Sequence, residues 1–102
     1  MELNDGLEVI GKTSFESCNW LQAITLPSTV RIIDERAFAH CSGIKTVELN
    51  DGLEVIRKSS FESCWCMYSI AFPSTVRQIE DNAFAHCHLE SIVLPPLIAC
   101  FA

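Results

Sequence analysis

The chain has 102 residues, of which 49% are hydrophobic and 20% are charged. It is therefore long enough for one folded domain and too apolar for a disordered segment. The net charge is -6 and the seven basic residues are scattered, so no cluster suits a phosphate backbone and no nucleic-acid partner is expected. We also expect no membrane span and no signal peptide, because the apolar runs are short and no basic segment precedes one. The chain as given thus favours the cytoplasm, and the cell surface stays open if it is a fragment.

The first elements in chain order are a turn, a strand, an irregular segment and a second strand. Asn4-Asp5-Gly6 predicts a turn, and the β-branched segment 7–10 after it predicts a short strand. The pattern L-x-x-I-x-L at 21–26 predicts a strand with one buried face. A Pro-Ser-Thr turn then leads to a strand predicted at 30–33. Segment 34–41 has early acids and late small residues, which predicts one or two helical turns with Asp34 as N-cap.

The same order returns every 23 residues, and the chain falls into units 3–25, 26–48, 49–71 and 72–93 with a tail at 94–102. Units one and three match closely, as do two and four, so a longer period of 46 is also present. A fixed period of this size indicates one supersecondary unit stacked on copies of itself. The columns that keep one residue type, or alternate only between Leu and Val, are expected to point inward. They are Phe15, Phe38, Phe61 and Phe84; Cys18, Cys41, Cys64 and Cys87; Leu7, Val30, Leu53 and Val76; and Ile10, Ile33, Ile56 and Ile79.

The six cysteines are interpreted mainly through this repeat. Four of them occupy one phase, which indicates small buried hydrophobes, and only Cys66 and Cys100 lie elsewhere. Without a secretory signal, reduced thiols are favoured over disulfides. The His/Cys pairs raise the alternative of zinc, but Cys64-Trp65-Cys66 and His86-Cys87-His88 do not have the spacing of a zinc finger. We therefore predict no metal and no cofactor.

The repeated residues resemble the BspA-type leucine-rich repeat family. The resemblance is carried by Ile24 to Pro27, Val30 to Ile33 and Ala37 to Cys41, and it spans Leu3 to Val93. It implies an α/β, right-handed leucine-rich repeat solenoid of four coils. Parallel strands would form one face, and short helical or irregular segments the other. It also implies a non-catalytic module that binds proteins or surface glycans, often in adhesins and in longer arrays.

Two departures from the commoner leucine-rich repeat pattern matter. The phase that usually holds an asparagine after the strand holds Gly52 or Thr29, so we expect no asparagine ladder. The array also lacks distinct caps, which would expose coil edges and favour self-association through the solenoid ends. A structural or self-associating scaffold without a specific ligand is therefore the alternative function.

The binding surface is predicted on the outward positions of the main strands. Its members are Gln22, Lys45, Thr46, Glu48, Tyr68 and Glu90. Tyr68 with Lys45 and Glu90 forms the best patch, because tyrosine is enriched at binding hot spots. Trp20 and Trp65 lie in the bends before the strands and outside the repeated columns, so each is either a partner anchor or packing for the bend, with packing slightly favoured. No catalytic residue is predicted, because Ser, His and Asp recur with the repeat and no nucleotide or nucleophile motif is present.

Overall fold

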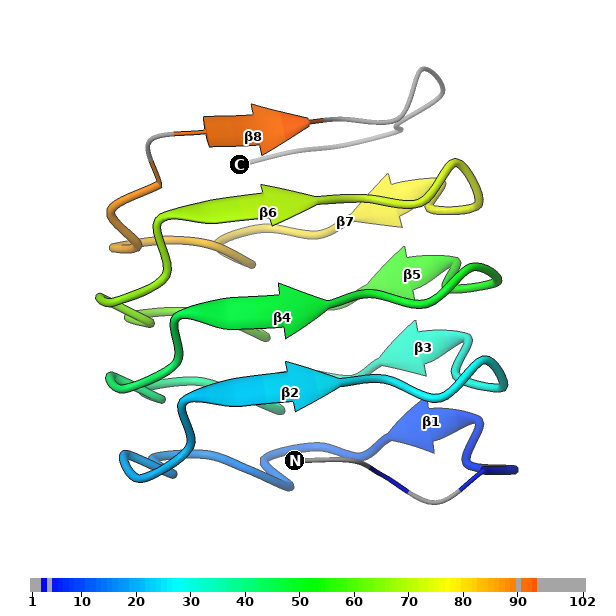
Figure 1. The fold of residues 1–102 in the computed structure, drawn as a ribbon, viewed down its shortest axis with the longest axis horizontal. Coiled ribbons are helices and arrows are strands. Elements are labelled where there is room, and N and C mark those ends of the chain that lie inside the picture. The colour runs from blue at the N-terminus through cyan, green and yellow to red at the C-terminus, as the bar shows by residue number, and fades with distance from the viewer. Residues whose placement is uncertain (1–2, 4, 90, 94–102) are drawn as a thin grey trace.

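The computed structural model describes residue 3 and residues 5–89 and 91–93, and for 91–93 it describes the backbone alone. The chain winds as a right-handed coil with eight short strands, two in each turn (Figure 1). In chain order they are β1 (Val9–Ile10), β2 (Ala23–Thr25), β3 (Ile32–Ile33), β4 (Thr46–Glu48), β5 (Val55–Ile56), β6 (Ser69–Ala71), β7 (Gln78–Ile79) and β8 (Ser91–Val93). The predicted parallel-strand solenoid is confirmed. The described residues include no helix that is long and apolar enough to cross a membrane.

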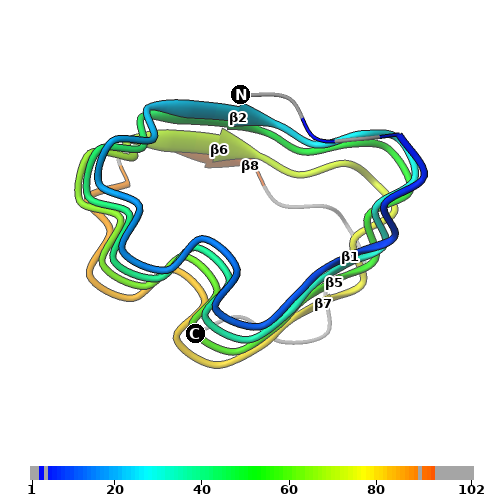
Figure 2. The same ribbon diagram turned by 90° about the horizontal axis from the view of Figure 1, so that it is seen from below.

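The strands pair in parallel with their equivalents in neighbouring coils. β1, β3, β5 and β7 form one continuous sheet, whereas β2 pairs with β4 and β6 pairs with β8 on the other face. Figure 2, viewed along the stack, shows the coils superposed around one interior. Most pairs are 23 residues apart, such as Val9 with Ile32, but Ser69 pairs with Ser91. The fourth coil thus absorbs its one-residue deletion in the bend and keeps its strand in register.

The helical turns predicted for 34–41 are absent, and consecutive turns take their place. Arg36 and His40 have positive φ values of 56° and 61°. The amides of Arg36, Phe38 and His40 donate to carbonyls of the next coil at 3.1, 2.7 and 2.7 Å. A helix needs these amides for its own i−4 carbonyls, so the cross-coil bonds exclude it. Asp34 correspondingly accepts from the adjacent Glu35 amide at 2.7 Å and caps no helix.

Positive φ values of non-glycine residues recur at two phases of the repeat. They are Thr13, Arg36, Ser59 and Asn82 at one phase, and Ser17, His40, Ser63 and His86 at the other. Such a conformation is disfavoured for residues with a Cβ. Its repetition in every coil shows that the inter-coil hydrogen bonds outweigh this local cost.

The core is organised around a stack of phenylalanine rings. Adjacent rings lie 5.1, 5.1 and 5.3 Å apart between centroids and within 4° of parallel. Phe38 and Phe61 are fully buried, and the predicted isoleucine column is buried throughout. One inward prediction is wrong: Leu7 is 36% exposed, whereas its equivalents Val30 and Leu53 are fully buried. Leu7 belongs to the first coil, so no described coil lies beneath it.

The cysteine column does more than fill space. The thiols of Cys41, Cys64 and Cys87 donate to the phenylalanine carbonyl of the preceding coil at 2.9, 3.2 and 3.1 Å. The five described cysteines are free thiols, as predicted, while Cys100 lies outside the described residues. Burial raises the pKa of Cys41, and the hydrogen bond with Cys87, together with burial, raises the pKa of Cys64. Cys41 and Cys64 therefore act as protonated donors that connect successive coils, whereas the hydrogen bond with Cys64 lowers the pKa of Cys87.

The 46-residue period has a structural cause at the corner between the two sheets. Thr75 accepts from the Gly52 amide at 3.0 Å and donates to the Leu53 carbonyl at 2.8 Å. An equivalent Thr29 bridge joins the first two coils. Between coils two and three, the buried Asn50 donates its Nδ2 to the Val30 carbonyl at 2.8 Å. Coils two and four thus bond to coils one and three through threonine, and coil three bonds to coil two through asparagine. The repeating structural unit is therefore a pair of coils.

Asn50 bridges two coils from a phase other than the one at which an asparagine ladder was expected to be absent. The phase at Gly52 and Thr29 indeed lacks asparagine, but Asn50 lies two residues earlier and bonds the neighbouring backbone from there. Pro73 occupies its phase in the next coil, so the contact can recur only in alternate coils.

Candidate functional site

The outward side of β2, β4 and β6 is the first candidate surface. Thr46 and Glu48 flank the buried position of β4, and Gln22, Lys45 and Tyr68 lie directly before β2, β4 and β6; all five are exposed. Tyr68 is 53% exposed. Glu90, the remaining member of the predicted patch, lies outside the described residues. We call the five described residues the strand face.

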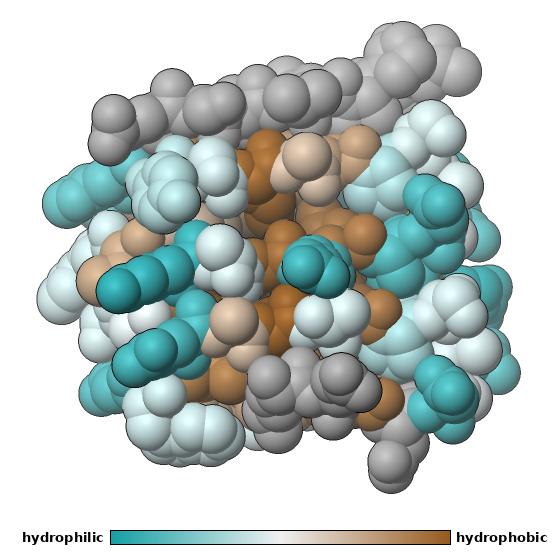
Figure 3. Space-filling model, viewed as in Figure 1, coloured by the Kyte–Doolittle hydropathy of each residue, from teal (hydrophilic) through white to brown (hydrophobic). Residues whose placement is uncertain are grey.

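Apolar surface runs across the middle of this side, with polar side chains to either side of it (Figure 3). The exposed alanines Ala23 and Ala71 contribute to this surface, whereas Ile24, Val47 and Ile70 between the outward positions are buried. A partner could therefore reach apolar surface and charged groups on the same side of the molecule.

Charges are distributed differently on the two sheets. On the β1-β3-β5-β7 side, Glu8 pairs with Arg31 at 3.6 Å and Glu54 pairs with Arg77 at 3.3 Å. On the strand face, the ammonium of Lys45 has no ion pair with any described residue. The strand face thus retains a charge that a partner could neutralise, whereas the opposite sheet pairs its own charges.

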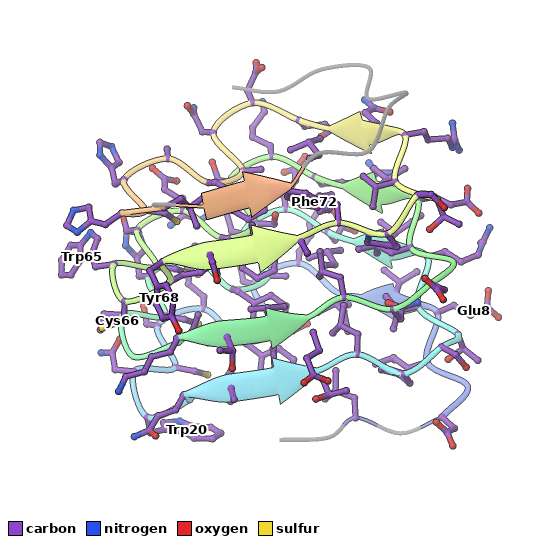
Figure 4. The ribbon with its side chains drawn as sticks, turned by 45° about the horizontal axis from the view of Figure 1, so that its top comes forward. Glu8, Trp20, Trp65, Cys66, Tyr68 and Phe72 are labelled. Carbon is purple, nitrogen blue, oxygen red and sulfur yellow. The ribbon has the colours of Figure 1, made fainter. Side chains whose placement is uncertain are left out.

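The two tryptophans are exposed, so the interpretation that favoured packing of the bends is wrong. Trp20 is 68% exposed and Trp65 is 56% exposed. In Figure 4, Trp65, Cys66 and Tyr68 lie together at the edge where β6 begins, and Trp20 lies before β2. Cys66 is exposed as well. The bends therefore present aromatic side chains to solvent beside the strand face.

A hollow of about 200 Å³ lies along this bend, and we call it the bend hollow. Three coils contribute two residues each to its lining. The lining residues are Ser17, Asn19, His40, Ser42, Ser63 and Trp65. Sequence reasoning noticed Trp65 and the outward His40 but missed the hollow, because its members, although they occupy only two phases of the repeat, differ in residue type from coil to coil.

Backbone contact holds the first two coils close together here. The Ser42 hydroxyl donates to Asn19 Oδ1 at 3.0 Å. A Cβ added to Gly43 would lie 2.4 Å from the Asn19 carbonyl oxygen, so only glycine permits this approach. Trp20 and Cys66 occupy the phase of Gly43 in the first and third coils, and the bend is therefore not an exact repeat.

Other polar clusters are satisfied by their own neighbours. Arg36 lies between Glu16 at 2.6 Å and Glu62 at 3.7 Å, and the hydrogen bond with Glu16 raises the pKa of Arg36. A second hollow, of about 230 Å³, contains Glu80, whose carboxylate accepts from the Lys58 amide and from Gln78. No group of three metal-ligating side chains occurs among the residues that the structure describes.

The fold and the repeat define a leucine-rich repeat solenoid. The chain belongs to the BspA-type leucine-rich repeat family, since the model for the "BspA type Leucine rich repeat region (6 copies)" matches residues 1–101. The resemblance predicted from the sequence is thereby confirmed, and the chain is a repeat module of that family.

Solved structures agree with this assignment. A leucine-rich cell surface protein from Faecalibacterium prausnitzii is 30% identical with a TM-score of 0.92, and the match covers 96% of this chain and 26% of that one. A leucine-rich repeat protein from Bacteroides capillosus is 32% identical with a TM-score of 0.79, and the match covers 85% and 62%. One from Bacteroides ovatus is 28% identical with a TM-score of 0.78, and the match covers 87% and 29%. The chain therefore spans less than two thirds of each of these proteins. A search of curated proteins found no match.

Proposed function

We propose that this chain is a non-catalytic binding module that recognises a protein or surface glycan through the strand face. The observation that carries the proposal is the exposed set of Lys45, Tyr68 and Glu48 around accessible apolar surface. The opposite sheet pairs Glu8 with Arg31 and Glu54 with Arg77, so these charges are less available to a partner. Tyrosine is enriched at binding hot spots.

The same proposal includes a place in a longer, surface-displayed array. It is supported by the similarity to a cell surface protein of which this chain matches only 26%. Repeat arrays place individual coils side by side on one extended face, so a four-coil segment would supply one part of such a surface.

The test is capture of partners with the immobilised chain, compared between two double variants. Lys45→Ala with Tyr68→Ala removes the centre of the strand face, and Glu8→Ala with Arg31→Ala removes an exposed pair from the opposite sheet. We expect the first to lose a saturable partner by at least tenfold and the second to retain it. Equal capture by both variants, with each folded like the parent, would contradict the proposal.

One observation favours the alternative of a self-associating scaffold. Leu7 and Val9 are 36% and 39% exposed in the first coil, whereas Val30 and Val55, at the same phases of later coils, are buried. This edge would accept another coil, either from a second copy or from a preceding repeat. Sedimentation at rising concentration tests it: association that Leu7→Lys abolishes supports the scaffold, and a monomer at all concentrations excludes it.

A further inference from the structure

We infer that the bend hollow is a second binding site, specific for one ring of a neutral saccharide. The inference takes from the proposed function only that the chain is a binding module, and it uses none of the strand-face residues. It depends on Trp65 together with the polar groups of three successive coils.

The aromatic part of the site is the exposed ring of Trp65. An exposed indole offers a large apolar surface with an N–H at its edge. A sugar ring has C–H groups on one face and hydroxyls around its rim, so it can lie on the indole while its hydroxyls reach polar neighbours. Trp65 is the only aromatic residue among the described residues that line the hollow.

The polar part consists of groups that both donate and accept. Three hydroxyls line the hollow: those of Ser17 and Ser63 can donate to or accept from a ligand hydroxyl, and that of Ser42, which donates to Asn19, can accept from one. The Ser63 residue is 7% exposed, and its hydroxyl has no hydrogen-bond partner among the described residues. Asn19 accepts from Ser42 through Oδ1, which leaves Nδ2 without a partner in the described structure. The Ser63 hydroxyl and the Asn19 amide can therefore both form hydrogen bonds with a ligand hydroxyl.

Size and charge narrow the class of ligand. At about 200 Å³ the hollow is smaller than the roughly 300–1,000 Å³ of pockets for drug-sized molecules, so it suits one ring of a longer chain. None of the described lining residues is Asp, Glu, Lys or Arg, and His40 is the one lining residue that can carry a charge, so the lining offers mainly neutral hydrogen-bonding groups. A neutral, hydroxyl-rich ring matches these groups.

The two tryptophans provide an internally controlled experiment. Trp20 is exposed in the neighbouring bend phase but does not line the hollow. Trisaccharides of mannose, galactose and N-acetylglucosamine are titrated into the whole chain while the two indole N–H signals are followed by NMR. We expect at least one trisaccharide to shift the Trp65 signal in a saturable way and to leave the Trp20 signal in place.

Matched variants complete the test. Trp65→Ala should weaken binding at least tenfold, Asn19→Ala should weaken it severalfold, and Trp20→Ala should leave it unchanged. Trp65→Phe, which keeps a ring, gives a second reading if Trp65→Ala fails to fold. Saccharides that shift neither indole, or both equally, at tens of millimolar would overturn the inference. Lys45→Ala with Tyr68→Ala should not alter saccharide binding. A negative result for binding at the strand face can therefore be distinguished from a negative result for saccharide binding in the bend hollow.

Discussion

Truncating Phe61 is the sharpest test of how the solenoid is held together. Its ring is fully buried and stacks on Phe38 at 5.1 Å and on Phe84 at 5.3 Å. Phe61→Ala removes the transfer free energy of the ring and leaves a cavity between two rings, which costs about 3–5 kcal/mol. Domains of this size are stable by about 5–15 kcal/mol, so the loss would be a large share of the total.

Phe15 provides the matched control. It is only partly buried and stacks on a single neighbour, Phe38. Phe15→Ala should therefore cost less than half as much, about 1–2 kcal/mol. The free energy of unfolding is measured by urea denaturation, with the slope compared between variants to verify that each unfolds in one transition. If Phe61→Ala is so unstable that no folded baseline remains, Phe61→Leu gives a measurable intermediate loss.

Two outcomes would refute this reasoning. A loss below about 1 kcal/mol for Phe61→Ala would mean that the ring is not a core residue. Equal losses for Phe61→Ala and Phe15→Ala would mean that stacking between two coils adds nothing beyond burial.

Three further outcomes are expected. Thr75→Val removes the bridge between the third and fourth coils and should cost about 1–2 kcal/mol in a urea melt, whereas Thr46→Val on the exposed strand face should change stability by less than about 0.5 kcal/mol. Iodoacetamide should label Cys66 in the folded chain and Cys64 only after unfolding, as mass spectrometry can show. The reason is that the thiolate is the reactive form and Cys64 is buried with a raised pKa. Equal labelling of the two cysteines in the folded chain would contradict the burial of Cys64. The pKa of Cys41 is raised above its ordinary value of 9.0 in the folded state, so its contribution to stability is present below pH 9 and is lost as the pH rises above it. Cys41→Ser should reduce this loss of stability above pH 9. An identical loss in the variant would contradict the assignment of the pH dependence to Cys41.

The columns of the sequence predicted most of the core correctly. A residue that returns at the same phase of a 23-residue repeat must occupy the same place in every coil, so Phe38, Phe61, Cys64 and Ile33 could be assigned inward positions without coordinates. The strand face followed for the same reason, because alternation along Ala23–Thr25 sets one side toward the core and the other toward solvent.

The turn segment could not be predicted in this way. Its early acids and late small residues suit a helical turn locally, but His40 adopts positive φ because its amide bonds to Glu62 in the next coil. That bond joins residues 22 positions apart, so the helix propensity of the local sequence does not predict it.

The longer period shows the same division between local and tertiary information. Sequence comparison revealed that coils alternate, but only the structure shows why, with Thr75 reaching Gly52 and Asn50 reaching Val30. The bend hollow could not be predicted from the sequence, because it depends on how Gly43 lets one coil approach the next.

The sequence by itself therefore determined the architecture of this protein: the stack, its inward columns, its outward strand side and its family. Only the tertiary structure decided the irregular turns, the exposure of Trp20 and Trp65, and the hollow beside Trp65. The physical reason is that repetition specifies what every coil shares. The surface chemistry instead comes from residues that differ between coils and meet only when the coils are stacked.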